Sequence, residues 1–269
     1  SCEGNFRIIS FHAFPGSNLS TMFEISLNGQ VAIITGASRG IGRAMSQIFA
    51  AAGAKLLLNY VQDDEAAASL AESLTSKGAE ILVCKGSVTD ADFVHKMVEQ
   101  CMDKWGRIDC LINNAAITRD TYFGFMNEND WHDVIAVNLN SLFYCCKAVN
   151  KTMIARQRGC IINMASVSAL VGREGQVNYS TAKAGVLGFT RSLAREFGRY
   201  NVRVNAIVAG IVDTDMTKRL PRKALNSLIL QTPLRRLARP SEIASVALFL
   251  ASDLASFVTG SCIEVDGGL

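Results

Sequence analysis

The sequence predicts an α/β protein with a single doubly wound parallel sheet and helices on both faces. Short apolar, β-branched runs alternate with longer helix-compatible segments along most of the chain. This order is typical of parallel strands joined by right-handed crossovers. A glycine-rich turn joins the first of these strands to the first helix. With 269 residues and 49% hydrophobic content the chain can bury one full core, and no repeat or low-complexity linker divides it.

Composition excludes several classes of function. The formal charge of +3 is too small to indicate a nucleic-acid-binding protein. No apolar run approaches the ~20 residues of a membrane span. The eight cysteines contain no Cys-x-x-Cys pair, and His12, His95 and His132 lack metal-ligand spacing. We therefore expect no metal, and reduced thiols in a cytoplasmic protein, with an organelle matrix as the alternative compartment.

The first 28 residues differ from the rest of the chain. They lack the charged region and the uninterrupted apolar region of a secretory signal. Met22 precedes the first strand closely and resembles a natural start, so residues 1–21 are expected to be upstream sequence. An ordered extension is the alternative. We expect residues 1–28 to lie outside the core and residues 29–269 to form the domain.

The turn at 35–42, TGASRGIG, follows a strand predicted at 31–34 and precedes a helix. In this order the three elements form a phosphate cradle. Gly36 permits the tight turn, Gly40 lets backbone approach the ligand, and Gly42 lets the helix pack closely on the strand. The context makes this pattern far more specific than three glycines alone.

The end of the second predicted strand bears on the choice of dinucleotide. Enzymes that use NAD place an acidic residue there to hold the ribose hydroxyls, but this chain has Asn59 and Tyr60. Arg39, in the glycine turn, is suited to pair with a 2′-phosphate. These residues favour NADP over NAD. Asp63 and Asp64 follow closely and remain the alternative source of the missing acid.

The other elements follow from hydrophobic periodicity, glycines and capping residues. In chain order they are a helix at 43–52, a strand at 53–60, a helix at 65–77, a strand at 80–84, a helix at 90–105, a strand at 108–112, a helical region at 133–153, a strand at 161–165, a helix that includes 179–183, a strand at 202–207, a helix at 240–251 and a strand at 261–265.

The stretch from 161 to 188 holds the residues best suited to chemistry. Its strand ends at Ser166, and Tyr179 and Lys183 stand four residues apart in the helix-compatible run that follows. At that spacing two side chains lie on one helical face. A hydroxyl, a phenol and an ammonium can therefore converge where a strand ends and a helix begins. This is the composition of a site that donates a proton to a carbonyl oxygen.

Taken together, these motifs resemble the short-chain dehydrogenase/reductase family from about residue 26 to the end. Within it the chain is most similar to 3-oxoacyl-acyl-carrier-protein reductases and to acetoacetyl-CoA reductases, and the resemblance implies a Rossmann-type sheet. The motifs that support this are TGASRGIG at 35–42, NNAA at 113–116, Asn138, Ser166, YSTAK at 179–183 and DTDM at 213–216.

The resemblance also implies roles for individual residues. The implied catalytic set is Asn138, Ser166, Tyr179 and Lys183. The implied cofactor contacts are Gly36, Ser38, Arg39, Gly40, Ile41, Gly42, Tyr60, Ser87, Val88, Asn114, Tyr179, Lys183, Val212 and Thr214.

Three positions depart from the family pattern. Ala116 replaces the glycine of NNAG, and Ala209 replaces the proline before Gly210. Ser87 stands where the family often has an aspartate that meets adenine. These changes affect the expected cofactor geometry and remove no proton-transfer group.

The expected chemistry is reduction of a ketone. Because an ordinary phenol has a pKa near 10, it is a slow acid–base catalyst at neutral pH. A lysine ammonium ~4 Å from Tyr179 would favour the phenolate by up to roughly 4 kcal/mol, about three pKa units. Ser166 can hydrogen-bond to the substrate oxygen and orient it. By family resemblance, Asn138 helps to hold a water that returns protons to Lys183.

The segment 217–236 contains six basic residues and no acid. It is either a solvated helix face or a lid that attracts the phosphate of a phosphopantetheine arm or an acidic acyl-carrier protein. Arg156, Arg158 and Arg199 would extend such a basic surface. Pocket-lining candidates near the catalytic set are Ser168, Glu174, Gln176 and Asn178, and each of them is equally compatible with a surface position.

The leading functional hypothesis is NADPH-dependent reduction of a 3-oxoacyl thioester to the 3-hydroxyacyl product, as in fatty acid biosynthesis, with Tyr179 as proton donor. One alternative is the same chemistry on a sugar, steroid or polyketide carbonyl. Another is an NADP-binding subunit without turnover, which the intact Ser166, Tyr179 and Lys183 argue against. Family resemblance implies a homotetramer.

Overall fold

The structure, a computed structural model, describes residues 25–218 and 220–269. The expectations for the first 24 residues fall outside this range. Among the described residues, none of the helices combines the length and the apolar character needed to cross a membrane.

The sheet has seven strands in the order β3-β2-β1-β4-β5-β6-β7, and every neighbouring pair is parallel. The predicted doubly wound parallel sheet is therefore confirmed. The strands are β1 (Val31–Ile34), β2 (Lys55–Tyr60), β3 (Ile81–Lys85), β4 (Cys110–Asn113), β5 (Gly159–Ser166), β6 (Val202–Ala209) and β7 (Cys262–Val265).

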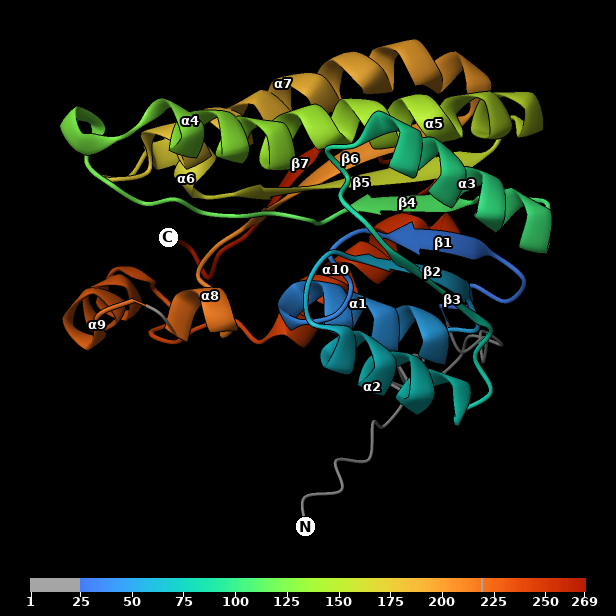
Figure 1. The fold of residues 1–269 in the computed structure, drawn as a ribbon, viewed down its shortest axis with the longest axis horizontal. Helices are drawn as coiled ribbons and strands as arrows, with labels where there is room; N and C mark the ends of the chain where they lie inside the picture. The colour runs from blue at the N-terminus through green and yellow to red at the C-terminus, as the bar shows by residue number, and fades with distance from the viewer. Residues whose placement is uncertain (1–24, 219) are drawn as a thin grey trace, which may run out of the picture.

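Helices cover both faces of the sheet. Figure 1 shows α3, α5 and α7 on one face and α1, α2 and α10 on the other, while α8 and α9 project from the end of the sheet. The α-helices are α1 (Gly40–Ala51), α2 (Asp64–Thr75), α3 (Ala91–Trp105), α4 (Glu128–Ile135), α5 (Ser141–Arg156), α6 (Ser168–Val171), α7 (Val177–Phe197), α8 (Asp215–Lys218), α9 (Arg222–Gln231) and α10 (Pro240–Ala251).

Alternation along each strand divides the core into two layers. Val31 and Ile33 of β1 pack with residues of α3 and α5, and Ala32 and Ile34 pack with residues of α1 and α10. Successive strand residues point to opposite faces. Because both faces are covered, the strands are apolar almost throughout, as buried parallel strands generally are.

Local sequence signals account for several helix boundaries. Asp90 caps α3 by accepting hydrogen bonds from the backbone N–H groups of Asp92 and Phe93. Gly106 ends α3 at φ +66°, in the left-handed region that glycine enters without a steric penalty. The helix predicted at 240–251 is α10, with Pro240 in its first turn.

The helical region predicted at 133–153 has a more complex structure. It comprises α4, a π-helical turn at Ala136–Asn140 and α5. Within the segment 217–236, half of the residues belong to α9, and the last two residues of α8 also fall there. Hydrophobic periodicity could not separate α4, the π-helical turn and α5, because the π-turn adds a residue to the turn without interrupting the helix.

Candidate functional site

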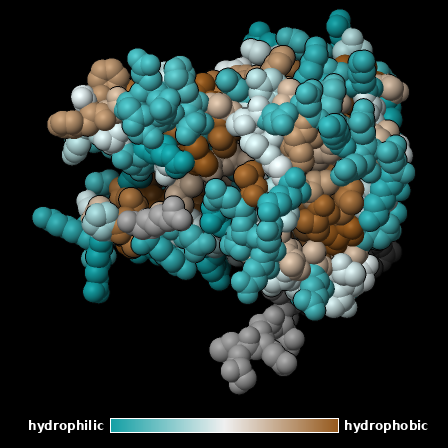
Figure 2. Space-filling view, in the orientation of Figure 1, coloured by the Kyte–Doolittle hydropathy of each residue, from teal (hydrophilic) through white to brown (hydrophobic). Residues whose placement is uncertain are grey.

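A cleft of about 450 Å³ opens at the carboxyl end of the sheet. It lies where the strand order reverses, between β1 and β4, and helices depart toward opposite faces. In doubly wound sheets this switch point is the usual place for a ligand. Figure 2 shows the molecule hollowed where α4 and α6 stand above α8 and α9, with hydrophobic residues inside the hollow.

The glycine turn forms one wall of the cleft. A Cβ on Gly42 would lie 2.2 Å from the carbonyl oxygen of Gly36, and Gly36 itself has φ +62°. The side chain of Asn114 donates to the carbonyl oxygens of Thr35 (2.9 Å) and Gly36 (3.0 Å), which fixes the turn to the end of β4. Helix α1 starts at this turn with neither a side-chain cap nor an acidic residue in its first turn. Its free N–H groups fit a dinucleotide pyrophosphate.

Asp63 and Asp64, the two candidate acids after β2, both have hydrogen-bond partners within the protein. Asp63 caps α2 through the backbone N–H of Ala66 at 3.0 Å. The Asp64 carboxylate accepts from the Tyr60 hydroxyl at 2.8 Å and from Lys85 at 2.7 Å, and these contacts lower its pKa. Neither aspartate lines the cleft, whereas Tyr60 and Arg39 do.

Ser166 and Tyr179 meet beside the cleft. Ser166 ends β5, and Tyr179 lies in the first turn of α7. Burial raises the pKa of Tyr179 to about 12, and a hydrogen bond with Ser166 lowers it in part. Since Tyr179 stays protonated at neutral pH, it is in the form that a proton donor requires.

Lys183 lies on the same face of α7 but does not act on Tyr179 as expected. Its ammonium is 2% exposed, donates to the carbonyl oxygen of Met164 at 2.8 Å and stands 5.7 Å from the centre of the Tyr179 ring. Burial lowers the pKa of Lys183 to about 8. The expectation that Lys183 makes Tyr179 more acidic is wrong for this structure, because the pKa of Tyr179 is raised, desolvation is the largest cause, and the charge of Lys183 is not among the causes.

Asn138 lies inside the π-turn between α4 and α5. Its side-chain amide donates to the carbonyl oxygens of Ile117 and Val134, both at 2.9 Å. Its own Oδ1 atom is buried and has no hydrogen-bond partner among the described residues. A buried acceptor left in this state is costly unless a ligand or water satisfies it.

Most of the predicted cofactor contacts line the cleft. They are Gly36, Ser38, Arg39, Gly40, Ile41, Gly42, Tyr60, Ser87, Val88, Asn114, Tyr179, Lys183 and Thr214. Val212, Asn138 and Ser166 lie outside this lining set. The departures Ala116 and Ser87 line the cleft, as does Ala209, which ends β6.

The suggested pocket residues after Ser166 make hydrogen bonds within the protein. Asn178 is buried and donates to the carbonyl oxygens of Arg119 and Asp130. Gln176 accepts from Ser168 at 3.1 Å and donates to Asp120 at 2.8 Å. The four candidates, Ser168, Glu174, Gln176 and Asn178, do not line the cleft.

Sequence reasoning missed several residues that do line the cleft. They are Val61, Gln62, Ala115, Ile117, Thr118, Arg119, Val137, Met164, Ala165, Asp215 and Met216. Each lies inside a quoted motif or predicted strand, or within a few positions of one. Parallel strands all end at one edge of the sheet, so their flanking residues could have been included on that ground.

Comparison with known proteins agrees with this geometry. A family model described as enoyl-(acyl carrier protein) reductase matches residues 36–269. The chain is 43% identical to a 3-oxoacyl-acyl-carrier-protein reductase of Synechocystis sp., covering 91% of this chain and 98% of that protein. It is 42% identical to the 3-oxoacyl-acyl-carrier-protein reductase FabG of Thermotoga maritima, with 90% and 98% covered.

A solved structure extends the comparison. The crystal structure of levodione reductase superposes with a TM-score of 0.85 at 34% identity, over 90% of this chain and 97% of that one. Family members use a nicotinamide cofactor, and the glycine turn fits such a group. The chain therefore belongs to the short-chain dehydrogenase/reductase family of oxidoreductases, and it is similar to 3-oxoacyl-acyl-carrier-protein reductases over about nine tenths of its length.

Proposed function

We propose that the protein reduces a 3-oxoacyl thioester to the 3-hydroxyacyl thioester with NADPH. The observation that supports this most strongly is the meeting of the Ser166 and Tyr179 hydroxyls beside the cleft that the glycine turn borders. Two hydroxyls within hydrogen-bond reach of each other suit a carbonyl oxygen that gains negative charge. The names of the FabG relatives supply the thioester class.

In the proposed mechanism a bound nicotinamide dinucleotide supplies the hydride. Ser166 donates a hydrogen bond to the ketone oxygen and orients it. Tyr179, which is protonated at neutral pH, gives its proton to that oxygen. Lys183, buried and held by the Met164 carbonyl, fixes an ammonium 5.7 Å from the centre of the Tyr179 ring. In this proposal, Oδ1 of Asn138, which is buried without a partner among the described residues, holds a water on the path that restores the proton.

The preference for NADPH rests on Arg39. Asp63 caps α2, Asp64 accepts from Tyr60 and Lys85, and neither of them lines the cleft, so neither is available for the ribose hydroxyls. Arg39 lines the cleft, is exposed and makes no ion pair among the described residues. A guanidinium in this position matches a phosphate with two hydrogen bonds.

Exchange of Arg39 tests the cofactor preference. A charge-assisted hydrogen bond contributes about 1.5–3 kcal/mol, so Arg39→Ala should lower kcat/KM for NADPH by roughly 10- to 100-fold. The value for NADH should change little. Arg43→Ala is a matched control, because Arg43 lies one turn further along α1 and donates to the carbonyl oxygen of Ala66. An equal loss for both dinucleotides would contradict the assignment.

A substrate panel tests the reaction itself. The family model is described as an enoyl reductase and one structural neighbour as levodione reductase, so enoyl thioesters and other ketones are the competing substrates. We expect NADPH oxidation with acetoacetyl-CoA to exceed that with crotonyl-CoA and with a cyclic diketone. Faster turnover of crotonyl-CoA would favour enoyl reduction, and faster turnover of the diketone would favour the other-carbonyl hypothesis. Failure of all three would revive the non-catalytic alternative.

The basic segment supports an acyl-carrier protein as the donor of the substrate. Arg236 is paired with Glu242 at 2.8 Å, and Lys218 lies 3.8 Å from Asp213. Arg222 and Lys223 of α9 make no ion pair among the described residues and remain available to an acidic partner. We expect kcat/KM for an acyl-carrier substrate to fall with salt more steeply than for a small ketone.

Family membership also leads us to propose a cytoplasmic homotetramer, which light scattering would test.

A further inference from the structure

Three side chains stand side by side near the amino end of the sheet. Cys110 of β4 is in register with Cys160 of β5, and Cys160 is in register with Arg203 of β6. Parallel neighbours in register point to the same face. Both cysteines belong to the core layer that contacts α1 and α10. The two thiols therefore lie next to each other, with a guanidinium on one side.

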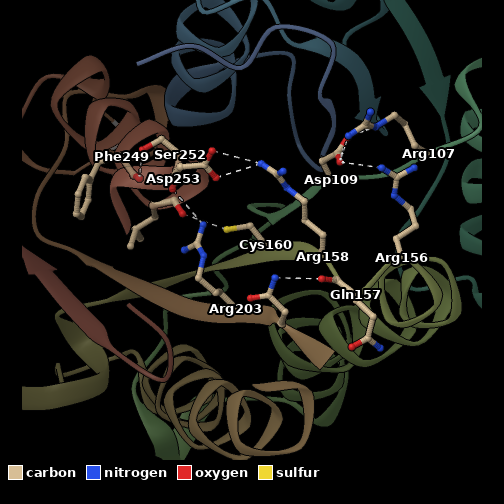
Figure 3. A network of polar contacts seen from close by, with 12 residues as sticks. Arg107, Asp109, Arg156, Gln157, Arg158, Cys160, Arg203, Phe249, Ser252 and Asp253 are labelled. Carbon is tan, nitrogen blue, oxygen red and sulfur yellow. Dashed lines mark hydrogen bonds and ion pairs between the residues drawn. The ribbon is translucent and has the colours of Figure 1, made fainter. Parts of the chain in front are cut away.

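A small cavity gives access to this row from outside. It has a volume of about 160 Å³, and its wall includes Cys160, Arg158, Arg203 and Asp253. Figure 3 shows Arg158 directed at Asp253 and Arg203 directed at the end of α10, with Cys160 between them. Cys160 itself is only 3% exposed. A molecule the size of water or hydrogen peroxide can reach its sulfur through the cavity.

Arg203 differs from the other arginines in this network. Arg107 and Arg158 each contact a carboxylate within 3.1 Å. Arg203 donates only to the backbone carbonyl oxygens of Ser252 (3.3 Å) and Val258 (3.5 Å) and has no carboxylate within 4 Å among the described residues. A partly buried cation without a counter-ion favours a negative charge on its neighbour.

That neighbour is Cys160. A hydrogen bond from the Cys110 thiol and the charge of Arg203 lower the pKa of Cys160 although its burial acts against this. The same hydrogen bond and burial hold the pKa of Cys110 well above its ordinary value. In the thiol form Cys160 donates to the carbonyl oxygen of Leu250 at 3.3 Å, a bond that it gives up on ionisation.

We propose that Cys160 and Cys110 form a thiol pair that hydroperoxides oxidise to a disulfide. The Cys160 thiolate attacks one oxygen of hydrogen peroxide, the O–O bond breaks, and hydroxide leaves, so the sulfur becomes a sulfenic acid. The Cys110 sulfur then attacks the Cys160 sulfur. The S–O bond breaks, and the proton of Cys110 leaves with the hydroxyl as water.

The spacing of the strands allows this bond. Neighbouring strands lie ~4.7–4.9 Å apart, within the ~4.4–6.8 Å Cα separation of disulfides. No other pair of described cysteines combines register with access. Burial raises the pKa of Cys145 and that of Cys101 to about 12 in each case, and neither lines the cavity. These thiols are expected to react slowly.

Mapping of oxidised cysteines in the full-length protein tests the proposal. The protein is treated with hydrogen peroxide for increasing times, alkylated in denaturant and digested, and the peptides are identified by mass. We expect the peptide that joins Cys110 to Cys160 to appear first and to vanish after treatment with dithiothreitol. Earlier oxidation of Cys101, Cys145 or Cys146, or reduced thiols throughout, would overturn the proposal.

Variants separate the two steps. In Cys110→Ala the sulfenic acid of Cys160 has no partner and should be trapped by dimedone, while basal ketone reduction is unchanged. Cys101→Ala is the matched control, a buried thiol outside the cavity, and should oxidise as the wild type does. Arg203→Met should slow oxidation about tenfold, as loss of the adjacent cation reduces the thiolate fraction. Equal rates in Arg203→Met and wild type, or sulfinic acid at Cys160 without the bridged peptide in wild type, would contradict the pair.

Discussion

Buried polar groups at the two ends of the sheet differ in how many hydrogen-bond partners they have. At the carboxyl end, the buried ammonium of Lys183 has only the carbonyl of Met164, and Oδ1 of Asn138 has no partner among the described residues. At the amino end, the buried carboxylate of Asp109 accepts from Arg107 at 2.6 and 2.7 Å and from the backbone N–H of Val31 at 2.9 Å. The polar groups of Lys183 and Asn138 are left partly unsatisfied, whereas the carboxylate of Asp109 is satisfied.

This difference separates chemistry from stability. A buried polar group without a partner destabilises the fold and is retained where a ligand can use it. A buried carboxylate with every partner in place fixes the start of β1 against β4. We therefore expect substitutions at the carboxyl end to change turnover, and substitutions around Asp109 to change the free energy of unfolding.

Tyr179→Phe should have the largest effect. It removes the proton donor while keeping the ring, so kcat for acetoacetyl-CoA should fall by roughly 10²–10⁴-fold with NADPH binding retained. Tyr200→Phe removes the same atom from a tyrosine that lies outside the cleft and should match wild type. Turnover within a factor of two of wild type in Tyr179→Phe would exclude Tyr179 from the mechanism.

Asp109→Asn should lower the free energy of unfolding by about 2–4 kcal/mol. It leaves Arg107 and Arg156 without their counter-ion, at a site where the carboxylate is 2% exposed and the two guanidinium groups are about one third exposed. Denaturant midpoints measure the change. Asp253→Asn is the control, since that carboxylate is 86% exposed and should alter stability by less than about 0.5 kcal/mol. If Asp109→Asn lowered the free energy of unfolding by an equally small amount, the ion pairs of Asp109 with Arg107 and Arg156 would contribute little to stability.

The pKa of Lys183 predicts an alkaline limit on activity. With a pKa of about 8, Lys183 is charged below that pH and neutral above it. The value of kcat/KM for NADPH reports the free enzyme, so it should fall about tenfold for each pH unit above the pKa. Lys183→Arg keeps its charge at every accessible pH and should lose this limb even if its activity is lower. If kcat/KM for NADPH of Lys183→Arg still fell above pH 8, the alkaline loss of activity would belong to another group.

The smallest effect concerns Glu242 at the start of α10. Hydrogen bonds from Arg236 and from the backbone N–H of Arg239 lower the pKa of Glu242 to about 2 from 4.5. Glu242→Gln should cost about 0.5–1.5 kcal/mol at neutral pH. Because the folded carboxyl has the lower pKa, the unfolded chain binds the proton first, and this stabilisation disappears as pH falls from about 4.5 to 2. A difference between wild type and variant that stayed constant over this range would contradict the assignment.

Much of the fold was predictable because its signals are local. The strand at 31–34 and the helix at 240–251 have the predicted bounds, and the glycine turn precedes α1 as expected. The spacing of Tyr179 and Lys183 on one helix was predictable for the same reason.

Properties that depend on residues distant in the sequence could not be predicted from it. The low pKa of Lys183 comes from burial under β5, and the commitment of Asp64 depends on Lys85 from a neighbouring strand. The row of Cys110, Cys160 and Arg203 needs the register of three strands. Periodicity fixes which face a residue occupies and leaves its cross-strand neighbours open.

The most direct test measures kcat per folded molecule for Asp109→Asn and Tyr179→Phe under one set of conditions, with acetoacetyl-CoA and NADPH. The structure predicts that Asp109→Asn keeps kcat within about twofold of wild type, while Tyr179→Phe loses at least about 100-fold. A comparable loss of kcat in both variants would contradict the separation of ketone reduction around Tyr179 from stability around Asp109.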